Sequence, residues 1–202
     1  FSTIAPATSI TLAERLAQQG VTYLDAPVTG GTEGARAGTL TVLVGGNTQA
    51  LARVQPLLEV IGESIHHFGS VGRGQQVKAL NQVLVAGSYA ALAEAIALGQ
   101  QLGLPMQEVI TALQHGAAGS WALQHRSTAM LEDHYPLGFK LALHHKDLGI
   151  ALETAERAGL QLPITSQVKS MEANLIEHGH SEEDVSVLRR WFDQQQAESQ
   201  QF

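Results

Sequence analysis

Cysteine is absent from this chain of 202 residues, so the chain can form no disulfide and offers no thiolate for catalysis. Charged residues are scarce, at 15%, and acidic side chains outnumber basic ones, which gives a formal net charge of −7. No stretch gathers lysine and arginine into a stripe, so the sequence predicts no nucleic-acid surface. No uninterrupted apolar run approaches the roughly 20 residues of a membrane span, and no signal peptide is visible. We expect an ordinary globular protein of a reducing compartment, the cytoplasm.

The start of the chain is unusual. Residue 1 is phenylalanine, and the segment FSTIAPATS reads like the end of a strand that runs into a helix cap. We therefore expect that an N-terminal part of the protein is missing. The alternative is a processed chain that is otherwise complete.

Up to about residue 70 the sequence alternates between strand and helix patterns, as in an α/β sheet. The run TLTVLVGG carries a good strand signal, because a β-branched stretch ends there in two glycines. The elements predicted in this part are a helix over 9–20, strands over 21–26 and 39–46, a helix from Asn47 to about Ile61 and a possible short strand at SIHHF.

From residue 75 the pattern becomes helical. One helix of about 28 residues would be about 42 Å long, and small residues in its middle let other helices approach closely. Further helices are predicted over 106–114, 121–131, 141–158, 164–178 and 182–192, followed by a fraying polar tail. The fold class is thus α/β plus all-α, with domains over 1–72 and 73–195 and a tail over 196–202.

The segment GRGQQVKALNQ, residues 72–82, looks at first like a phosphate loop before a helix. The dinucleotide fingerprint would place a third glycine or alanine at residue 77, and Val77 stands there. Lys78, Asn81 and Gln82 are three and four residues apart, so they converge on one helical face. A partly dehydrated lysine can act as a general acid or base. From spacing alone, a solvated lysine near a helix end is the more frequent alternative.

The glycine-rich stretch DAPVTGGTEGARAGTL, residues 25–40, follows directly after the strand predicted at 21–26. Ligands bind at strand-end loops of α/β sheets. Thr29, Gly30 and Gly31 offer consecutive backbone N–H groups and one hydroxyl, which can hold a carboxylate without a charged side chain. The alternative is a mobile connection.

Two further features involve charged or titratable residues. Lys146 and Asp147 interrupt the apolar pattern of a predicted helix in LHHKDLGIAL, where the alternative is an exposed ion pair of little energetic value. Histidines occur in pairs at 66–67, 144–145 and 178/180. Neighbouring residues of a strand point to opposite faces and no carboxylate cluster accompanies the histidines, so we expect no metal site.

Taken together, these stretches resemble the β-hydroxyacid dehydrogenase family, the 3-hydroxyisobutyrate dehydrogenase-like enzymes. The segments FSTIAP, DAPVTGG, GRGQQVKALNQ, GSWAL and PLGFKLALHHKDLGIAL are similar to family segments in the same order, with Thr29 where serine is usual. The resemblance implies the last part of a Rossmann nucleotide domain, a long interdomain helix and a helical domain. The glycine-rich dinucleotide loop of the family would lie in the missing N-terminal half.

The resemblance also implies roles for individual residues. It implies interconversion of a small 3-hydroxy acid and its semialdehyde or keto form, with NAD or NADP as cofactor. Lys78 would be the catalytic acid/base, oriented together with the substrate oxygen by Asn81 and Gln82. The residues that would contact substrate are Thr29, Gly30, Gly31, Gln82, Ser120 and Trp121, and those that would contact the cofactor are Thr3, Phe139 and Lys146.

Two alternatives accompany this interpretation. Imine reductases share the architecture but generally carry another residue at the catalytic lysine, so Lys78 argues against them. A non-catalytic dimerisation fragment would need no cofactor site. We expect a homodimer or higher oligomer that is inactive alone. Apolar residues available for a core or a dimer seam are Val83, Leu84, Leu92, Ile96, Leu148 and Leu152.

Overall fold

The computed structural model describes residues 1–199, which fold as two compact units. The first unit holds Phe1–Gln82 and Gly149–Gln161, and the second holds Val83–Leu148 and the described residues from Leu162 onward. A compact unit need not coincide with a domain, so the predicted domain limits remain a prediction. Each unit is described by itself.

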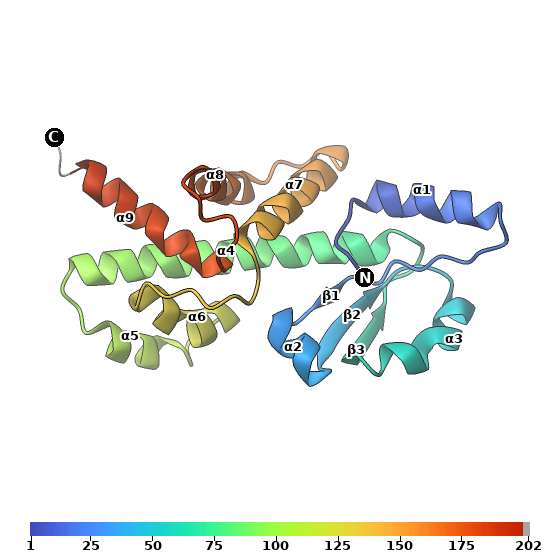
Figure 1. Ribbon diagram of the computed structural model, residues 1–202, viewed down its shortest axis with the longest axis horizontal. Helices are drawn as coiled ribbons and strands as arrows, with labels where there is room; N and C mark the ends of the chain where they lie inside the picture. The colour runs from blue at the N-terminus through green and yellow to red at the C-terminus, as the bar shows by residue number, and fades with distance from the viewer. Residues whose placement is uncertain (200–202) are drawn as a thin grey trace. The chain divides into compact units, whose positions relative to one another are not determined.

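The first unit contains a three-stranded sheet of β1 (Val28–Thr29), β2 (Leu40–Val44) and β3 (Gly62–His67), in that order. Figure 1 shows these strands as arrows; β2 pairs antiparallel with β1 and parallel with β3. The strands predicted at 39–46 and at SIHHF are confirmed.

The strand predicted over 21–26 is wrong. Within it only Asp25 pairs, through an isolated bridge to Gly45. The irregular pairing continues where Leu43 N donates to Pro27 O at 2.9 Å, before the short β1 begins. The β pattern of 21–26 ends just before the observed strand β1, because the hydrogen-bonding partner decides where a strand forms.

Three helices accompany this sheet: α1 (Pro6–Ala17), α2 (Gly31–Ala37) and α3 (Thr48–Leu58). Asn47 caps α3 as predicted, because its side chain accepts a hydrogen bond from Ala50 N at 3.0 Å. The helix α2 corrects the expectation of a loop in the glycine-rich stretch. The small core of the first unit consists of Ala26, Val42, Val44 and Leu58.

The predicted long helix is confirmed as α4 (Arg73–Gln101), 29 residues in length. By length and composition α4 is apolar enough to cross a membrane, with a mean hydropathy of 1.4 over its best window. This corrects the expectation of no such segment, because many alanines raise the average without forming an uninterrupted apolar run. Of that window 44% is buried inside the protein, and buried core helices pass the same test.

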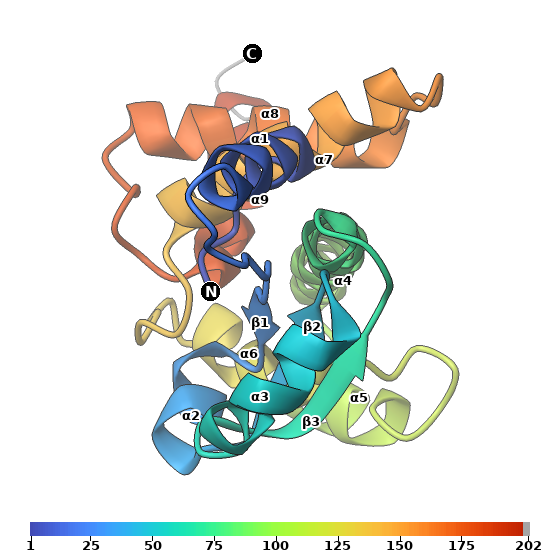
Figure 2. The same ribbon diagram turned by 90° about the vertical axis from the view of Figure 1, so that its right-hand side faces the viewer.

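The second unit is helical. It contains much of α4 together with α5 (Met106–Leu113), α6 (Trp121–Leu131), part of α7 (Leu141–Arg157), α8 (Pro163–Glu177), a 3-10 turn η1 (Val185–Val187) and α9 (Leu188–Ser199). Figure 2 views the same helices from the side. Its large core gathers residues of all these elements, with Leu141, Leu148, Leu175 and Leu188 fully buried.

The last predicted helix, 182–192, begins and ends elsewhere. Asp184 caps the turn η1, since its carboxylate accepts a hydrogen bond from Ser186 N at 3.0 Å. The helix α9 then continues to Ser199, so the predicted polar tail is helical up to that residue. Residues 200–202 of the tail lie outside the described residues.

Candidate functional site

The N-terminus of α4 is capped by a carboxylate from another segment of the first unit. Asp25 is buried, and its two oxygens accept hydrogen bonds from Gly72 N at 2.7 Å and Gln75 N at 2.9 Å. A side chain at Gly74 would collide with the carbonyl oxygen of Leu43 and lie 2.8 Å from Asp25 Oδ2. The lack of a side chain at Gly74 therefore lets α4 approach the sheet. Because the Asp25 carboxylate already accepts hydrogen bonds from these amides, this helix terminus does not serve as a phosphate loop.

The face that begins one turn inside α4 is buried. Lys78 is 9% exposed and Gln82 is 1% exposed, although lysine is rarely buried in proteins. Asn81 Nδ2 donates a hydrogen bond to Gln82 Oε1 at 2.7 Å. The alternative of a solvated lysine is thus wrong, and Lys78 has the partial dehydration that acid–base work requires.

Gln75 ties the first residues of the chain to α4. Its side chain is buried, accepts a hydrogen bond from Ile4 N at 3.2 Å and donates one to Ser2 O at 2.8 Å. Thr3 lies between these two anchored residues. Gln75 was not among the residues predicted from the sequence, although its position three residues before Lys78 places it on the same helical face.

Thr29, Gly30 and Gly31 lie where β1 ends and α2 begins. Gly30 has a φ of 128° and Gly31 a φ of 65°, which other residues adopt only with strain. A Cβ at Gly31 would lie 2.9 Å from Glu33 Oε2, so an anionic side chain already lies beside these backbone groups. A substrate carboxylate bound here would have to displace or avoid Glu33.

Ser120 and Trp121 begin α6 in the second unit. The Ser120 hydroxyl caps the helix by accepting a hydrogen bond from Leu123 N at 3.0 Å. Trp121 is 48% exposed, which excludes a core role. Its ring stacks on His125, with ring centroids 4.5 Å apart, and the Arg126 guanidinium lies 4.6 Å from its centroid.

Phe139 and Lys146, the other expected cofactor residues of this unit, differ in exposure. Phe139 is half-buried, and its backbone N donates to Asp184 Oδ2 at 2.8 Å. The Lys146 side chain is 49% exposed and its Nζ lies 2.9 Å from Oδ1 of the buried Asp147. The ion pair of the alternative interpretation is present, but Asp147 is buried rather than exposed, and the exposed ammonium of Lys146 can still meet a dissolved anion.

Buried polar groups of the second unit were not anticipated. Asp184 accepts hydrogen bonds from Gly138 N at 3.0 Å and Phe139 N at 2.8 Å, which fixes the segment before α7. His144 and Glu172 form a pair 2.5 Å apart that is closed to solvent. Pairing across so many residues leaves no local sequence signal.

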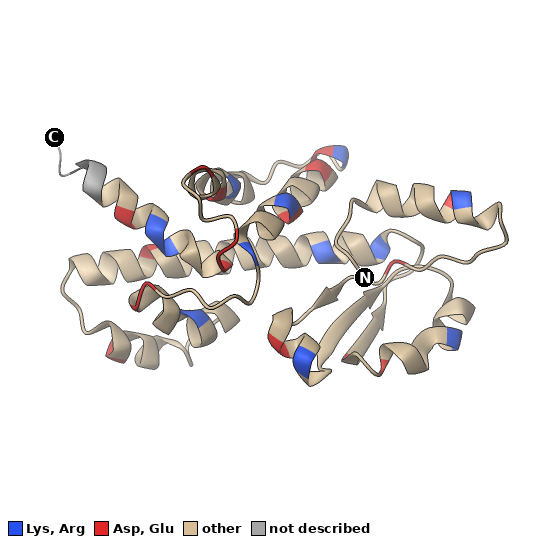
Figure 3. Cartoon of the chain, in the orientation of Figure 1, with Lys and Arg blue, Asp and Glu red and all other residues tan. Residues whose placement is uncertain are grey.

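Burial also changes the pKa of one histidine in the second unit. Burial lowers the pKa of His145, next to Lys146, and the positive charge of Lys169 lowers it further. Both effects favour the neutral form of the His145 ring. Figure 3 shows that acidic and basic residues are scattered along the helices of the second unit rather than gathered.

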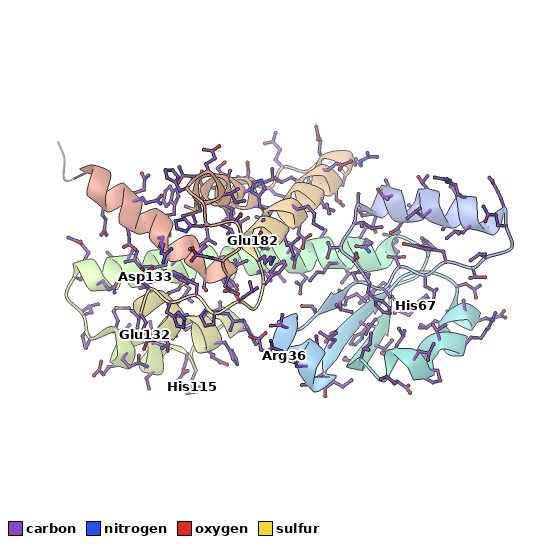
Figure 4. All side chains as sticks on the ribbon, in the orientation of Figure 1. Arg36, His67, His115, Glu132, Asp133 and Glu182 are labelled. Carbon is purple, nitrogen blue, oxygen red and sulfur yellow. The ribbon has the colours of Figure 1, made fainter. Side chains whose placement is uncertain are left out.

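No group of three or more His, Asp or Glu side chains suited to a metal is present among residues 1–199. Figure 4 labels His67 at the end of β3, His115 after α5, and the neighbours Glu132 and Asp133 directly after α6. The ring of His67 is hydrogen-bonded through Nε2 to Gly46 O at 2.7 Å. The expected absence of a metal remains a prediction.

Two family models match this chain, and the boundary between them lies near residue 70, where the sequence pattern changes. Residues 72–192 match the family model described as the NAD-binding domain of NADP-dependent 3-hydroxyisobutyrate dehydrogenase. The chain belongs to the 3-hydroxyisobutyrate dehydrogenase family. Residues 1–69 match the NAD binding domain of 6-phosphogluconate dehydrogenase, so the sheet of the first unit is the last part of a Rossmann domain.

Individual relatives support this membership. The 2-(hydroxymethyl)glutarate dehydrogenase of Eubacterium barkeri is 35% identical over 95% of this chain and 64% of its own length. The NAD-dependent L-serine dehydrogenase of Pseudomonas aeruginosa is 37% identical over 98% of this chain and 68% of its own length. The chain thus spans about two thirds of these relatives.

Solved structures agree. The crystal structure of 3-hydroxyisobutyrate dehydrogenase from Salmonella typhimurium has a TM-score of 0.86 and 30% identity, covering 94% of this chain and 67% of that one. A Streptomyces aurantiacus imine reductase has a TM-score of 0.55 at 18% identity, covering 94% of this chain and 68% of that one. The second likeness shows a shared fold and no more.

The residues fit a nicotinamide dinucleotide in part. Lys146 offers an exposed ammonium to an anionic group, and Thr3 is held in place by its anchored neighbours. The amides at the N-terminus of α4 do not fit a phosphate, because the Asp25 carboxylate occupies them. Contacts to the cofactor phosphates would thus have to come from elsewhere.

Proposed function

We propose that this chain forms part of an NAD(P)-dependent dehydrogenase that interconverts a small 3-hydroxy acid and its semialdehyde or keto form. The observation that carries the proposal is the buried Lys78 on the face shared with Asn81 and Gln82. Because the chain spans about two thirds of its relatives, the activity is proposed for a longer protein that contains it.

Lys78 acts in this proposal as the acid/base. When bound, the nicotinamide supplies the hydride for reduction and accepts it for oxidation. The Lys78 ammonium donates a proton to the substrate oxygen as a carbonyl becomes a hydroxyl, and the amine takes that proton back in the reverse direction. The hydrogen bond between Asn81 and Gln82 fixes both amides, which orients the lysine and the substrate oxygen.

The remaining assignments rest on the family resemblance. Thr29, Gly30 and Gly31 hold the substrate carboxylate, and Ser120 and Trp121 contact the rest of the substrate. The cofactor residues are Thr3, Phe139 and Lys146. The two relatives named above act on 2-(hydroxymethyl)glutarate and L-serine, each a carboxylate with a hydroxyl on the β carbon. That chemistry supports the proposed substrate class.

The test uses a chimera that joins these 202 residues to the N-terminal third of the L-serine dehydrogenase. We expect Lys78→Ala to lower kcat by at least about 100-fold, the scale of a lost general acid–base group, while cofactor affinity changes little. Lys78→Arg keeps the positive charge but cannot release its proton, so it should be nearly as slow. Stopped-flow absorbance of NAD(P)H measures the rate.

Lys140→Ala is the matched control, because Lys140 forms a surface pair with Glu182 and has no proposed role. A Lys78→Ala enzyme with near-normal kcat at neutral pH contradicts the assignment. The 202-residue chain alone should show no turnover, and measurable oxidation of NAD(P)H with a semialdehyde contradicts that part.

The imine reductase alternative is not favoured, because the buried lysine is retained here and the likeness concerns the fold alone. The alternative of a dimerisation fragment gains support from exposed leucines on α4, and we propose that the chain forms a homodimer or a higher oligomer. The cytoplasmic location remains a prediction.

A further inference from the structure

The carboxylate of Asp184 fixes the segment that leads into α7. Asp184 is 1% exposed, and its Oδ2 atom accepts hydrogen bonds from Gly138 N at 3.0 Å and Phe139 N at 2.8 Å. Its other oxygen, Oδ1, accepts hydrogen bonds from Ser186 N at 3.0 Å and Ser186 Oγ at 2.6 Å. Hydrogen bonds to an ionised carboxylate are stronger than those between neutral groups. Asp184 therefore holds the backbone of Phe139 in one position.

Arg126 of α6 supplies a positive charge to this buried carboxylate. Arg126 Nε lies 3.4 Å from Asp184 Oδ1, and only 12% of the Arg126 side chain is exposed. Taking a carboxylate out of water is costly unless an opposite charge lies close to it, and loss of that partner leaves the buried charge uncompensated. The position of Asp184 thus depends in part on Arg126.

The same arginine contacts the exposed ring of Trp121. The guanidinium carbon of Arg126 lies 4.6 Å from the centroid of the Trp121 ring, within the range of a cation–π interaction. Arg126 Nη1 also donates a hydrogen bond to His125 O at 3.2 Å. Because the guanidinium is a rigid plane, a rotation that changes its distance to Asp184 also changes its contact with Trp121. Arg126 therefore links an exposed aromatic ring to a buried carboxylate.

Phe139 is bound to Asp184 and Val185 through both of its backbone groups. Its N–H donates to Asp184 Oδ2, and its carbonyl oxygen accepts a hydrogen bond from Val185 N at 2.9 Å. Its ring meets the ring of the buried His144 edge to face, with ring centroids 5.6 Å apart. A displacement of Asp184 therefore moves the backbone of Phe139 and turns its ring relative to His144.

We propose that Asp184 is a positioning residue that couples Trp121 to Phe139 through its ion pair with Arg126. The inference rests on the proposed function, in which Trp121 contacts the substrate and Phe139 contacts the cofactor. Binding at either ring shifts Arg126 or Asp184 and so changes the orientation of the other ring. Such coupling is reciprocal, so the cofactor changes the affinity for substrate by the same factor as the substrate changes the affinity for cofactor.

Hydrogen exchange in the 202-residue chain tests the coupling without any ligand. Arg126→Met keeps an apolar stem against Trp121 and removes the charge. The uncompensated Asp184 then favours local opening, so the amides of Gly138 and Phe139 should exchange at least about tenfold faster. Asp184→Asn keeps one acceptor oxygen and should also speed exchange. In the double variant no charge is uncompensated, so exchange should be no faster than in Asp184→Asn alone.

Arg190→Met is the matched control. The Arg190 guanidinium lies 5.0 Å from the centroid of the Tyr135 ring and pairs with Asp133, so the same kinds of contact are lost in the same unit. Exchange at Gly138 and Phe139 should not change in this variant. Equal acceleration by Arg190→Met, or single effects that multiply in the double variant, overturns the coupling.

A folded state of each variant is established by circular dichroism. Arg126→Gln provides a second uncharged variant and should behave like Arg126→Met. Arg126→Lys retains the positive charge beside Asp184 and should restore slow exchange at Phe139. Fast exchange in Arg126→Lys that matches the uncharged variants would show that packing, and not the ion pair, holds this segment.

Cofactor binding tests the functional consequence in the chimera described above. Arg126→Met should raise the Kd for NADH or NADPH, measured by nicotinamide fluorescence without substrate, by about fivefold, a modest coupling, although Arg126 contacts the ring assigned to the substrate. Arg190→Met should leave that Kd unchanged. A Kd of Arg126→Met within about twofold of the parent value overturns the coupling and leaves the proposed function intact. A chimera that binds neither nucleotide overturns the proposed function and the coupling with it.

Discussion

The two units of this chain are held together in different ways. The second unit has a large core in which Leu141, Leu148 and Leu175 are closed to solvent. The first unit has a small core cluster of four buried apolar residues, and it relies in addition on the hydrogen bonds that Gln75 of α4 donates to Asp25 and to Ser2 O. The difference teaches that packing stabilises the helical unit, whereas hydrogen bonds position the segment around Lys78.

The largest effect should come from the packed core. Leu175→Ala should lower the free energy of unfolding of the second unit by about 3–5 kcal/mol, because a fully buried leucine leaves a cavity. Hydrogen exchange resolved by segment measures the loss, which should be concentrated in α5, α6, α8 and α9. Leu113→Ala, at a site 49% exposed, is the control. An equal loss throughout the first unit would show that the two units unfold as one.

The polar ties should give the next largest effect. Asp25→Ala leaves the amides of Gly72 and Gln75 without their buried acceptor, which should cost about 2–3 kcal/mol of the first unit's stability. Asp25→Asn keeps one acceptor oxygen and should lose less. Denaturant titration combined with exchange at the start of α4 measures both variants. Unchanged exchange at Gly72 and Gln75 in Asp25→Ala would argue against the cap.

The smallest effect should come from a surface ion pair of the second unit. Asp133 accepts a hydrogen bond from Arg190 Nε at 2.7 Å, and this bond lowers the pKa of Asp133. Asp133→Asn should cost only about 0.5 kcal/mol at pH 7, because the pair is largely exposed to water. Asparagine also tolerates the φ of 50° found at this residue.

The pH dependence of that effect has a definite sign. A carboxyl with a lowered pKa stabilises the folded state above its ordinary value and loses this contribution as the pH falls through the folded value. The difference between the parent chain and Asp133→Asn should therefore be constant near neutral pH and shrink below about pH 4. Thermal melts of both proteins at a series of pH values measure it, and a difference that grows at low pH would contradict the pairing.

Much of the helical structure follows from local sequence. The predicted bounds 121–131 match α6, and Asn47 caps α3, because periodicity and capping are encoded within a few residues. The strand predicted at 21–26 failed because strand formation depends on a distant pairing partner. The helix α2 forms in spite of its glycines, where tertiary context overrides propensity.

The candidate site, like the fold, could be predicted from the sequence only in part. The shared face of Lys78, Asn81 and Gln82 follows from helical spacing, and the structure adds the burial of Lys78. Asp25, which caps this helix, precedes Gly72 by 47 residues in the sequence, so no local pattern predicts the contact. The sequence thus locates the side chains proposed for the chemistry, while long-range contacts decide what holds them.

The interruption of the first unit in sequence has a consequence for protein synthesis. Its first part ends at Gln82, and its second part begins at Gly149 and ends at Gln161. The ribosome must therefore add the 79 residues from Val83 to Gln161 before the first unit can be complete. At about 5–20 residues per second this takes about 4–16 s. During this time the sheet of the first unit lacks Gly149–Gln161, which is encoded after most of the second unit.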